Sequence, residues 1–435
     1  MKISVIGCGY LGAVHAACLA DLGHEVIGID TDGAKVNELS AGRAPFFEPG
    51  LNDLLASAIT SGRLRFSTEF TAVAGSRVHF VTVGTPQLDG KYAADVSYVD
   101  SAIEALTPWL QPGDLVVGKS TVPVGTAARL SAALHDKGAG ASLAWNPEFL
   151  REGYAVKDTM SPDRLVYGIE PGNLDAEALL DEVYALALAS STPKVVTDFA
   201  TAELVKVAAN AFLATKISFI NAMAEVAEAT GANVTQLADA IGYDTRIGRR
   251  FLNAGLGFGG GCLPKDIRAF MARAEELGVT EALGFLREVD EINLRRRGRM
   301  VDIATKAVGG DLNGKRIAVL GLAFKPNSDD VRDSPALDVA ARLLAAGASV
   351  VATDPQAIEK ARALHPELEY AATSGAAVAG ADAVLLLTEW QEYRDLDPDA
   401  LGELVAQRVI VDGRNSLVPA KWREAGWLYR AFGQP

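Results

Sequence analysis

Several residue types are scarce in this chain of 435 residues, and each shortage excludes a class of protein. The three cysteines, Cys8, Cys18 and Cys262, form no CxxC pair, which excludes a disulfide framework and a zinc ribbon. The five histidines show no ligand spacing, so we expect no metal site. So few cysteines suit a reducing compartment, and we expect a cytoplasmic protein.

Long apolar runs and blocks of one charge are also missing. No run approaches the roughly 20 apolar residues of a transmembrane helix, and the opening MKISVIGCGY is typical of a strand rather than a signal peptide. The 41 basic and 55 acidic residues give a net charge of -14, which is spread along the chain. An acidic surface of this kind leads us to expect no nucleic-acid and no membrane partner.

The hydrophobic pattern changes twice along the chain and predicts three regions: 1–198, 199–310 and 311–435. In the first region, short β-branched runs alternate with helical patterns, which is typical of a doubly wound parallel sheet. We expect strands there at Lys2–Ile6, Glu25–Asp30, Val78–Val83, Leu115–Lys119 and Ser142–Trp145. The same texture resumes after Asp311, with strands expected at Arg316–Leu320, Ser349–Thr353, Ala383–Thr388 and Val409–Asp412 and a helix at about Ser334–Ala346.

The middle region is predicted to be all-helical. From Ala200 to Gly231, apolar residues recur at helical spacing without a proline, and a second helix is expected from about Thr280 to Ala307. The first helix would be more than about 40 Å long. A helix so long and so apolar usually links domains or packs against a second subunit, so we expect a homodimer. The fold class is α/β, with two Rossmann-like doubly wound domains joined by a central helical region.

A dinucleotide-binding fingerprint follows the first strand. Gly7, Gly9 and Gly12 form GxGxxG at the start of a helix, and Asp30 ends the next strand. The glycines allow a tight turn, the approach of a pyrophosphate and close helix packing, while the acid binds the ribose hydroxyls and repels the 2′-phosphate of NADP. We expect NAD as the cofactor, with Lys35 near the adenosine end.

Two further turns carry hydroxyl side chains at strand ends. Thr85 lies in VGTP and Thr121 in KSTVPVGT, and both follow predicted parallel strands. Ligands bind at this edge of such a sheet, although Gly, Thr and Pro also end strands in ordinary turns.

Cys262 lies in the stretch GLGFGGGCLPKD, beside Lys265 and Asp266. A nearby cation lowers the pKa of a thiol, and a carboxylate can act as a general base, whereas most lone cysteines are inert and buried. Beside an NAD site, a thiolate could add to an aldehyde, and oxidation followed by hydrolysis would give an acid.

Other polar residues lie in settings that suit the same chemistry. Lys206 and Asn210 are one turn apart on the long helix and could stabilise an oxyanion, or they could be a snorkelling lysine and a solvated asparagine. Glu148, in NPEFLRE, could relay protons or form a surface ion pair. A second group of basic residues could bind a diphosphate: Arg246, Arg249, Arg250, Lys325 and Arg332. Arg295, Arg296, Arg297 and Arg299 are expected on a solvated helix face.

In combination these motifs resemble the UDP-glucose 6-dehydrogenase family, within a group that includes GDP-mannose and UDP-N-acetylhexosamine dehydrogenases. The resemblance rests on GCGYLG, VGTP, KSTVPVGT, NPEFLREG, AELVKVAANAFLATKISFINAMAE, FGGGCLPKD and FKPNSDDVRDSP, and it covers essentially the whole chain. It implies an NAD-binding domain at 1–198, a central helical dimerisation region at 199–310 and a UDP-sugar-binding domain at 311–435. It also implies the oxidation of UDP-glucose to UDP-glucuronate with two NAD.

The resemblance also implies roles for single residues. Cys262 would be the nucleophile, Lys206 and Asn210 would stabilise the oxyanion, Asp266 would activate water, and Thr121 and Glu148 would position water or move protons. The residues expected to bind NAD are Gly7, Gly9, Tyr10, Leu11, Gly12, Asp30, Lys35, Thr85, Thr121, Glu152, Lys265 and Arg332. Those expected at the sugar nucleotide are Glu148, Phe149, Leu150, Arg151, Glu152, Lys206, Asn210, Arg250, Phe251, Leu252, Asn253, Ala254, Gly255, Gly259 and Lys325.

Two departures from the family pattern are local. Gly261 stands before the cysteine where many relatives have serine, and FLNAG at 251–255 is more polar in some relatives. GDP-mannose and UDP-N-acetylhexosamines are the alternative substrates. Two other hypotheses stay open. The protein could be a two-electron dehydrogenase with the same domain organisation, which would not need Cys262, or an NAD-binding protein without turnover.

Overall fold

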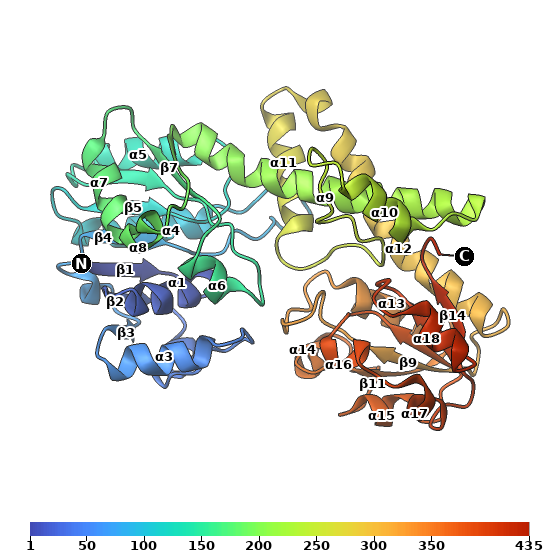
Figure 1. Ribbon diagram of the computed structural model, residues 1–435. Helices are drawn as coiled ribbons and strands as arrows, with labels where there is room; N and C mark the ends of the chain where they lie inside the picture. Colours follow the sequence, from blue (N-terminus) through green and yellow to red (C-terminus); the bar gives the residue numbers. More distant parts are fainter. Residues whose placement is uncertain (435) are drawn as a thin grey trace. The chain divides into compact units, whose positions relative to one another are not determined.

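The computed structural model describes residues 1–434, which form two compact units. The N-terminal unit comprises Met1–Ala209 and Arg268–Gly278, and the C-terminal unit comprises Asn210–Ile267 and Val279–Pro435. Each unit contains one twisted sheet flanked by helices (Figure 1).

The sheet of the N-terminal unit has eight strands in the order β3-β2-β1-β4-β5-β6-β7-β8. Every neighbouring pair is parallel except β6 and β7, which are antiparallel. The five strands predicted from the sequence pair in parallel as expected, and the antiparallel neighbour β7 was not predicted. The strands are β1 (Lys2–Ile6), β2 (Glu25–Ile29), β3 (Leu64–Ser67), β4 (Val78–Val81), β5 (Leu115–Gly118), β6 (Ser142–Trp145), β7 (Leu165–Ile169) and β8 (Lys194–Thr197).

Helices cover both faces of this sheet, and each face has its own buried apolar cluster. One cluster joins Ile3, Val5 and Phe80 to α1, α3 and α7, and the other joins Ile6, Ile29 and Val81 to α4 and α5. The helices are α1 (Tyr10–Asp21), α2 (Gly33–Ser40), α3 (Leu51–Thr60), α4 (Ser97–Leu106), α5 (Thr126–Asp136), α6 (Ala155–Met160), α7 (Leu174–Val183) and α8 (Ala185–Ala189), with short turns η1 (Phe70–Val73) and η2 (Thr107–Trp109).

The sheet of the C-terminal unit has six strands, all parallel, in the order β11-β10-β9-β12-β13-β14. The strands are β9 (Arg316–Leu320), β10 (Ser349–Thr353), β11 (Glu369–Tyr370), β12 (Ala383–Leu386), β13 (Val409–Asp412) and β14 (Leu428–Ala431). The helices connecting them are α13 (Pro335–Ala345), α14 (Ile358–Leu364), α15 (Ser374–Val378), α16 (Gln391–Arg394), α17 (Pro398–Gly402) and α18 (Pro419–Glu424). The α/β fold class with two doubly wound sheets and a helical middle is confirmed.

The middle of the chain consists of α9 (Phe199–Thr230), α10 (Val234–Gly242), α11 (Leu263–Glu276), η3 (Thr280–Leu283) and α12 (Phe285–Ala307). Helix α9 ends at Thr230, directly before Gly231, whose φ of 74° lies in the region that only glycine adopts easily. By length and composition, α9 alone among the described helices could cross a membrane, contrary to our expectation that no apolar stretch is long enough to do so. One such helix is weak evidence, since long helices of soluble proteins pass the same test.

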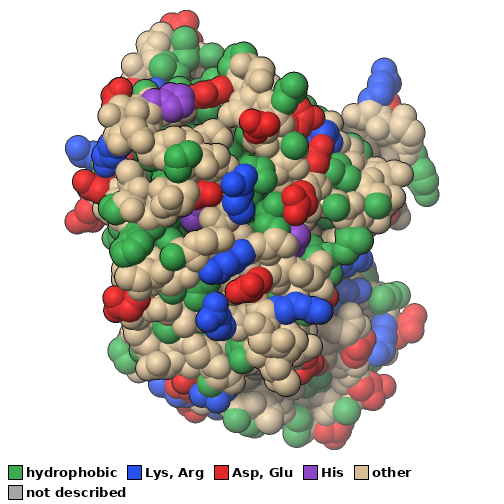
Figure 2. Space-filling view, turned by 90° about the vertical axis from the view of Figure 1, so that its left-hand side faces the viewer, with side chains coloured by type: hydrophobic (Ala, Val, Ile, Leu, Met, Phe, Trp, Pro, Cys, Tyr) green, Lys and Arg blue, Asp and Glu red, His purple; other side chains and the backbone are tan. Residues whose placement is uncertain are grey.

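The expectation of a solvated arginine face on α12 is wrong for two of its four members. Arg296 and Arg297 are buried, with 0% and 6% of their surface exposed, whereas Arg295 and Arg299 are partly exposed. Arg296 lies over the Phe432 ring and donates to the Gly255 carbonyl. These tertiary contacts hold its guanidinium inside the protein rather than in solvent. On the face shown in Figure 2, acidic and basic side chains are interspersed rather than gathered by sign.

Candidate active site

The turn between β1 and α1 has the geometry that a dinucleotide requires. Gly7 has φ of 91°, and a Cβ atom on Gly12 would lie 1.9 Å from the Gly7 carbonyl oxygen, so both positions need glycine for the fold itself. A Cβ atom on Gly9 would meet nothing within 4 Å. Packing therefore explains the first and third glycines, and the open space at the second leaves room for a ligand to approach the backbone.

Asp30 follows β2 and lies against this turn. Its Oδ2 atom accepts from the Cys8 backbone N–H at 2.8 Å and pairs with Lys35 Nζ at 2.9 Å. Asp32 caps the next helix, α2, through its side chain. The carboxylate is thus fixed beside the glycine turn, where an acid can bind ribose hydroxyls, and these residues fit NAD.

The two hydroxyl turns at the strand ends contact each other. Thr85 Oγ1 donates to the Thr121 carbonyl at 2.7 Å, and Ser120 Oγ donates to the Val83 carbonyl at 2.7 Å. From the other side, the buried carboxylate of Glu203 accepts backbone N–H groups of Gly125 and Ala127, each at 2.7 Å. The segment that carries Thr121 is therefore held at both ends.

Glu148 and Lys206 form a nearly buried ion pair. Lys206 Nζ lies 2.8 Å from Glu148 Oε1, and the two side chains are 6% and 12% exposed. Glu148 Oε2 also accepts from the Leu150 backbone N–H at 2.8 Å. The snorkelling interpretation of Lys206 is therefore excluded, because its ammonium group points into the protein rather than into water.

The loop that begins with Asn146 is anchored by a residue that the sequence did not single out. Glu48 is buried and accepts backbone N–H groups of Gly153 at 2.6 Å and Ala155 at 2.7 Å. Its carboxylate also accepts from the hydroxyl of Tyr10, in the glycine turn. One carboxylate thus fixes the dinucleotide turn and the loop of Glu148 in a single arrangement.

Cys262 is the exposed member of the three cysteines. Burial raises the pKa of the Cys8 thiol far above its ordinary range and that of Cys18 to about 12, so neither forms a thiolate easily. Cys262 immediately precedes the first residue of α11. A helix N-terminus favours negative charge and therefore a thiolate at this place.

Asp266 lies one turn further along α11 and is 2% exposed. Its Oδ2 atom accepts from Asn210 Nδ2 at 2.6 Å, and its Oδ1 atom lies 2.7 Å from Lys265 Nζ. The structure thus brings three of the sequence-predicted residues, Asn210, Lys265 and Asp266, into one hydrogen-bonded group. Asn210 is held by this carboxylate and is not a solvated side chain.

The glycine run before Cys262 packs against the segment between β9 and α13. Cβ atoms on Gly259 and Gly261 would lie 2.3 Å from the Asp333 carbonyl oxygen and 2.4 Å from the Arg332 guanidinium carbon. These glycines let two chain segments approach each other. A serine in place of Gly261 would meet only the end of a flexible arginine side chain, so that family departure is structurally mild.

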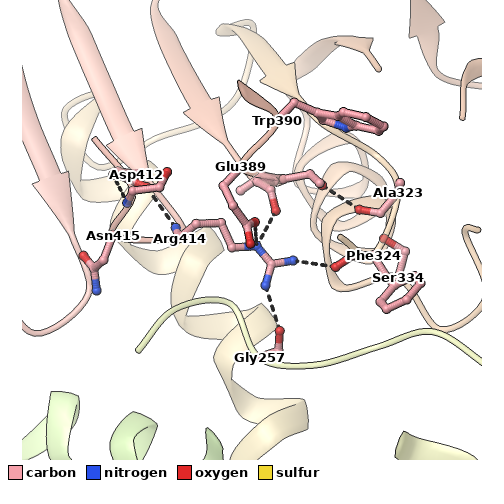
Figure 3. Close-up of polar contacts among 12 residues, drawn as sticks. Gly257, Ala323, Phe324, Ser334, Glu389, Trp390, Asp412, Arg414 and Asn415 are labelled. Carbon is pink, nitrogen blue, oxygen red and sulfur yellow. Dashed lines mark hydrogen bonds and ion pairs between the residues drawn. The ribbon is translucent and has the colours of Figure 1, made fainter. Parts of the chain in front are cut away.

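Arg414, absent from the sequence-based expectations, joins three segments of the C-terminal unit (Figure 3). Its guanidinium donates to the carbonyl groups of Gly257 at 2.8 Å, Phe324 at 3.1 Å and Leu387 at 2.7 Å. Nearby, Asn293 both accepts from and donates to the backbone of Phe258. The backbone of Gly257 and Phe258, in the loop that leads to Cys262, is therefore held by side chains of the same unit.

Three of the five basic residues that were expected to bind a diphosphate form ion pairs with nearby carboxylates. Arg246 pairs with Asp244 at 2.6 Å, Arg249 with Asp239 at 2.5 Å and Arg332 with Asp330 at 2.7 Å. Arg250 and Asn253 are exposed, whereas Leu252, Ala254 and Gly255 are buried. Arg151 pairs with Asp158 at 2.7 Å, and Lys325 lies over the Phe324 ring.

Three family models match the chain in order: the UDP-glucose/GDP-mannose dehydrogenase family NAD binding domain at residues 1–188, its central domain at 200–295 and its UDP binding domain at 318–419. The chain belongs to the UDP-glucose/GDP-mannose dehydrogenase family. Members of this family are NAD-dependent, so the chain is an NAD-dependent oxidoreductase that acts on a nucleotide sugar.

Individual members of the family match over their whole length. A UDP-glucose 6-dehydrogenase of Rhizobium meliloti (strain 1021) is 43% identical, with 100% of both chains covered. A solved UDP-glucose dehydrogenase of Pyrobaculum islandicum is 41% identical with a TM-score of 0.90, covering 100% of this chain and 98% of that one. A UDP-D-ManNAc dehydrogenase of Pyrococcus horikoshii has a TM-score of 0.87 at 26% identity, with 100% and 99% covered.

The anchoring residues Glu48, Glu203 and Arg414 were not among the residues that the sequence singled out. Glu48, Glu203 and Arg414 act on backbone groups that are distant in sequence, so no local motif marks them. The one available signal was weak: each is a charged residue inside or beside an apolar segment, where burial requires a partner.

Proposed function

We propose that this enzyme oxidises UDP-glucose to UDP-glucuronate and reduces two NAD per sugar. The observation that carries the proposal is the exposed Cys262 at the start of α11, one turn from an Asp266 that is held by Asn210. The identity of 41–43% to the two UDP-glucose dehydrogenases supports this sugar over the alternatives, which are GDP-mannose and the UDP-N-acetylhexosamines.

In the first oxidation, the C6 hydroxyl of glucose becomes an aldehyde. Glu148, with Thr121, takes or relays the hydroxyl proton, and the Lys206 ammonium group beside it balances the charge of the carboxylate. NAD, when bound, accepts a hydride in each of the two oxidations.

In the second oxidation, the Cys262 thiolate adds to the aldehyde and gives a thiohemiacetal. Lys206 and Asn210, one turn apart on α9, donate hydrogen bonds to its oxygen. Oxidation gives a thioester, and Asp266 activates the water that releases the acid and the thiol. A two-electron dehydrogenase would use none of these last steps.

The binding residues named from the resemblance belong to this proposal. Gly7, Gly9, Tyr10, Leu11, Gly12, Asp30, Lys35, Thr85, Thr121, Glu152, Lys265 and Arg332 bind NAD, and 148–152, 250–255, Gly259 and Lys325 bind the sugar nucleotide. The proposal also divides the chain into an NAD-binding region at 1–198, a helical region at 199–310 and a sugar-nucleotide region at 311–435. It includes a cytoplasmic location for the enzyme.

We also propose a homodimer formed through α9. Phe212, Phe219 and Val226 are spaced by seven residues on this helix and are 67%, 47% and 54% exposed. Apolar side chains at this spacing form one stripe, and a second copy of the same helix would cover it. Sedimentation of the wild type and of Phe212→Asp tests the dimer directly.

The decisive experiment counts NADH per sugar with limiting UDP-glucose and excess NAD. We expect two, with UDP-glucuronate as the product. Cys262→Ala should reduce acid formation by about a thousand-fold or more, while Cys18→Ala, which changes a buried cysteine, should retain it. One NADH per sugar would instead indicate a two-electron dehydrogenase, and none with UDP-glucose but two with another sugar nucleotide would correct the substrate.

A further inference from the structure

Lys119 is a buried amine in the N-terminal unit that the proposed mechanism does not use. It follows β5 directly and is 7% exposed. Its ammonium group donates to Asn146 Oδ1 at 2.9 Å and to the Tyr184 hydroxyl at 3.3 Å, and it lies 5.7 Å from the centre of the Phe80 ring. These partners are neutral, and within residues 1–434 no ion pair compensates for its burial. A buried lysine without a carboxylate partner is costly unless it can lose its proton.

Lys119 and Glu148 line the same cavity, of about 60 Å³. That volume is enough for about four water molecules at roughly 15 Å³ each. His15 also lines the cavity, and its Nε2 atom has no hydrogen-bond partner among the described residues. A buried ring nitrogen of this kind is normally satisfied by water, so the cavity is suited to a short water chain between the amine and the carboxylate.

Burial, modified by two nearby charges, places the pKa of the Lys119 amine near neutral pH. Burial lowers the pKa of Lys119 to about 7, Glu148 opposes this shift, and Lys206 on α9 adds to it. Burial also holds the pKa of His15 on α1 well below 6.5 and that of Tyr184, between α7 and α8, well above 10, so both stay neutral. The other charged groups on the cavity wall are Asp158 of α6 and Asp163 and Arg164 before β7.

We propose that Lys119 takes up, through Glu148 and the shared cavity, the proton that the sugar hydroxyl releases on oxidation. The inference rests on the proposed oxidation of a sugar alcohol and deepens it. Lys119 acts through Glu148 and is therefore a positioning residue for the proton, not a catalytic residue.

The step balances without a further reactant. The O–H bond of the hydroxyl breaks, and its proton passes to the Glu148 carboxylate while the carbon loses a hydride to NAD. Glu148 then gives a proton to the cavity water, and the water gives one to the neutral amine, which becomes ammonium. The ammonium later returns its proton to solvent, and the carboxylate is again ready to accept.

A relay of this kind gives Lys119→Met a distinctive pH dependence. Only the neutral amine can accept a proton, so its contribution appears above pH 7 and is lost below it. The rate of the first hydride transfer in the wild type, divided by that in Lys119→Met, should rise from about one at pH 6 to about ten or more at pH 8. Lys137→Met changes an exposed lysine and should give a ratio near one throughout. A ratio that is equally large at every pH would indicate a structural role and overturn the proposal.

A second measurement does not depend on turnover. In the full-length protein labelled with ¹³C at lysine Cε, the Lys119 signal is the one missing from Lys119→Met, and it should titrate near pH 7. Tyr184→Phe removes an acceptor from the ammonium group, and Glu148→Gln removes a negative charge, so each should move the midpoint to lower pH. An amine that stays charged up to pH 9, or a midpoint unmoved by Glu148→Gln, would contradict the relay.

The two proposals fail in different ways. If no sugar nucleotide yields NADH while the amine titrates and responds to Glu148→Gln, the proposed function fails and the coupling of Lys119 to Glu148 stands. If UDP-glucose yields two NADH but the rate ratio is independent of pH, the function stands and the relay is wrong.

Discussion

The first turns of the two sheets use the same backbone frame. Gly7 and Gly321 have φ of 91° and 100°, and their N–H groups donate to the carbonyls of Ile29 and Thr353 at 2.7 and 2.8 Å. A carboxylate after the second strand then accepts the next N–H, from Cys8 in one case and Leu322 in the other, each at 2.8 Å. These features belong to the βαβ frame itself and carry no information about a ligand.

The two turns differ in where the next helix begins and in how many hydrogen bonds the carboxylate accepts. After Gly7, α1 begins within three residues, and Gly9 leaves the space beside Asp30 open. After Gly321, α13 begins only at Pro335, and Asp354 is used internally: it also accepts from the N–H groups of Ala323, Gln356 and Ala357 and from Trp390 Nε1. An acid saturated by its own unit has no capacity left for a ribose, so only the first turn is suited to a dinucleotide.

The largest expected effect separates two glycines of one motif. Gly12→Ala places a Cβ atom 1.9 Å from the Gly7 carbonyl oxygen and should destabilise the N-terminal unit by more than about 4 kcal/mol. Gly9→Ala meets no protein atom and should leave stability within about 0.5 kcal/mol while weakening NAD about ten-fold or more. Chemical denaturation and NAD titration test both, and equal stability losses would show that Gly9 is structural.

The next effect distinguishes the two acids. Asp354→Ala leaves several buried donors unsatisfied and should destabilise the C-terminal unit by about 3 kcal/mol. Hydrogen exchange of β9 peptides should report this loss, with β1 peptides and NAD affinity unchanged. Asp30→Ala is the matched variant in the N-terminal unit. It should lower NAD affinity more than it lowers the free energy of unfolding.

A smaller effect concerns the choice of dinucleotide. Asp30→Ala removes the charge that would repel the 2′-phosphate, so the ratio of NADP to NAD affinity should rise about ten-fold or more. Asp354→Ala should leave that ratio unchanged. If the ratio of NADP to NAD affinity is unchanged in Asp30→Ala, the ribose of the dinucleotide does not bind at Asp30.

The last effect appears only below pH 6.5 and is a difference in acid sensitivity. Burial lowers the pKa of His15 and His24 in the N-terminal unit, so the unfolded chain binds more protons than the folded one below pH 6.5. Stability is therefore full above pH 6.5 and falls as the pH drops, by up to about 1.4 kcal/mol per pH unit for each histidine. His15→Leu should flatten this slope in denaturation at pH 7 to 5, and His135→Gln, at an exposed position, should not.

The strands that sequence patterns predicted best are the central ones. β1, β6, β9, β10 and β13 agree with the expectation at both ends, because burial on both faces gives a continuous run of apolar residues. β3, β8, β11 and β14 were not predicted, and all four lie at sheet edges, where burial is partial and the pattern is weak. β7 was also missed, although it is buried throughout.

Residues whose chemistry depends on local sequence were visible before the structure. The glycine turn with Asp30, the glycine run with Cys262 and the i, i+4 pair Lys206 and Asn210 each lie in one short segment, so spacing alone predicts them. Their candidate roles and the α/β fold class follow from the sequence for that reason. The choice of sugar depends on the comparison with relatives.

The tertiary structure decided which charges are buried and what holds each loop. Glu48, Glu203 and Arg414 bind backbone groups between 27 and 157 positions away, and Lys119 meets Glu148 only across a cavity. Sequence patterns record the period of a helix or strand, but they do not record which elements pack together. Because the desolvation of a charge depends on that packing, the ionisation of Lys119 and the burial of Arg296 could be known only from the folded chain.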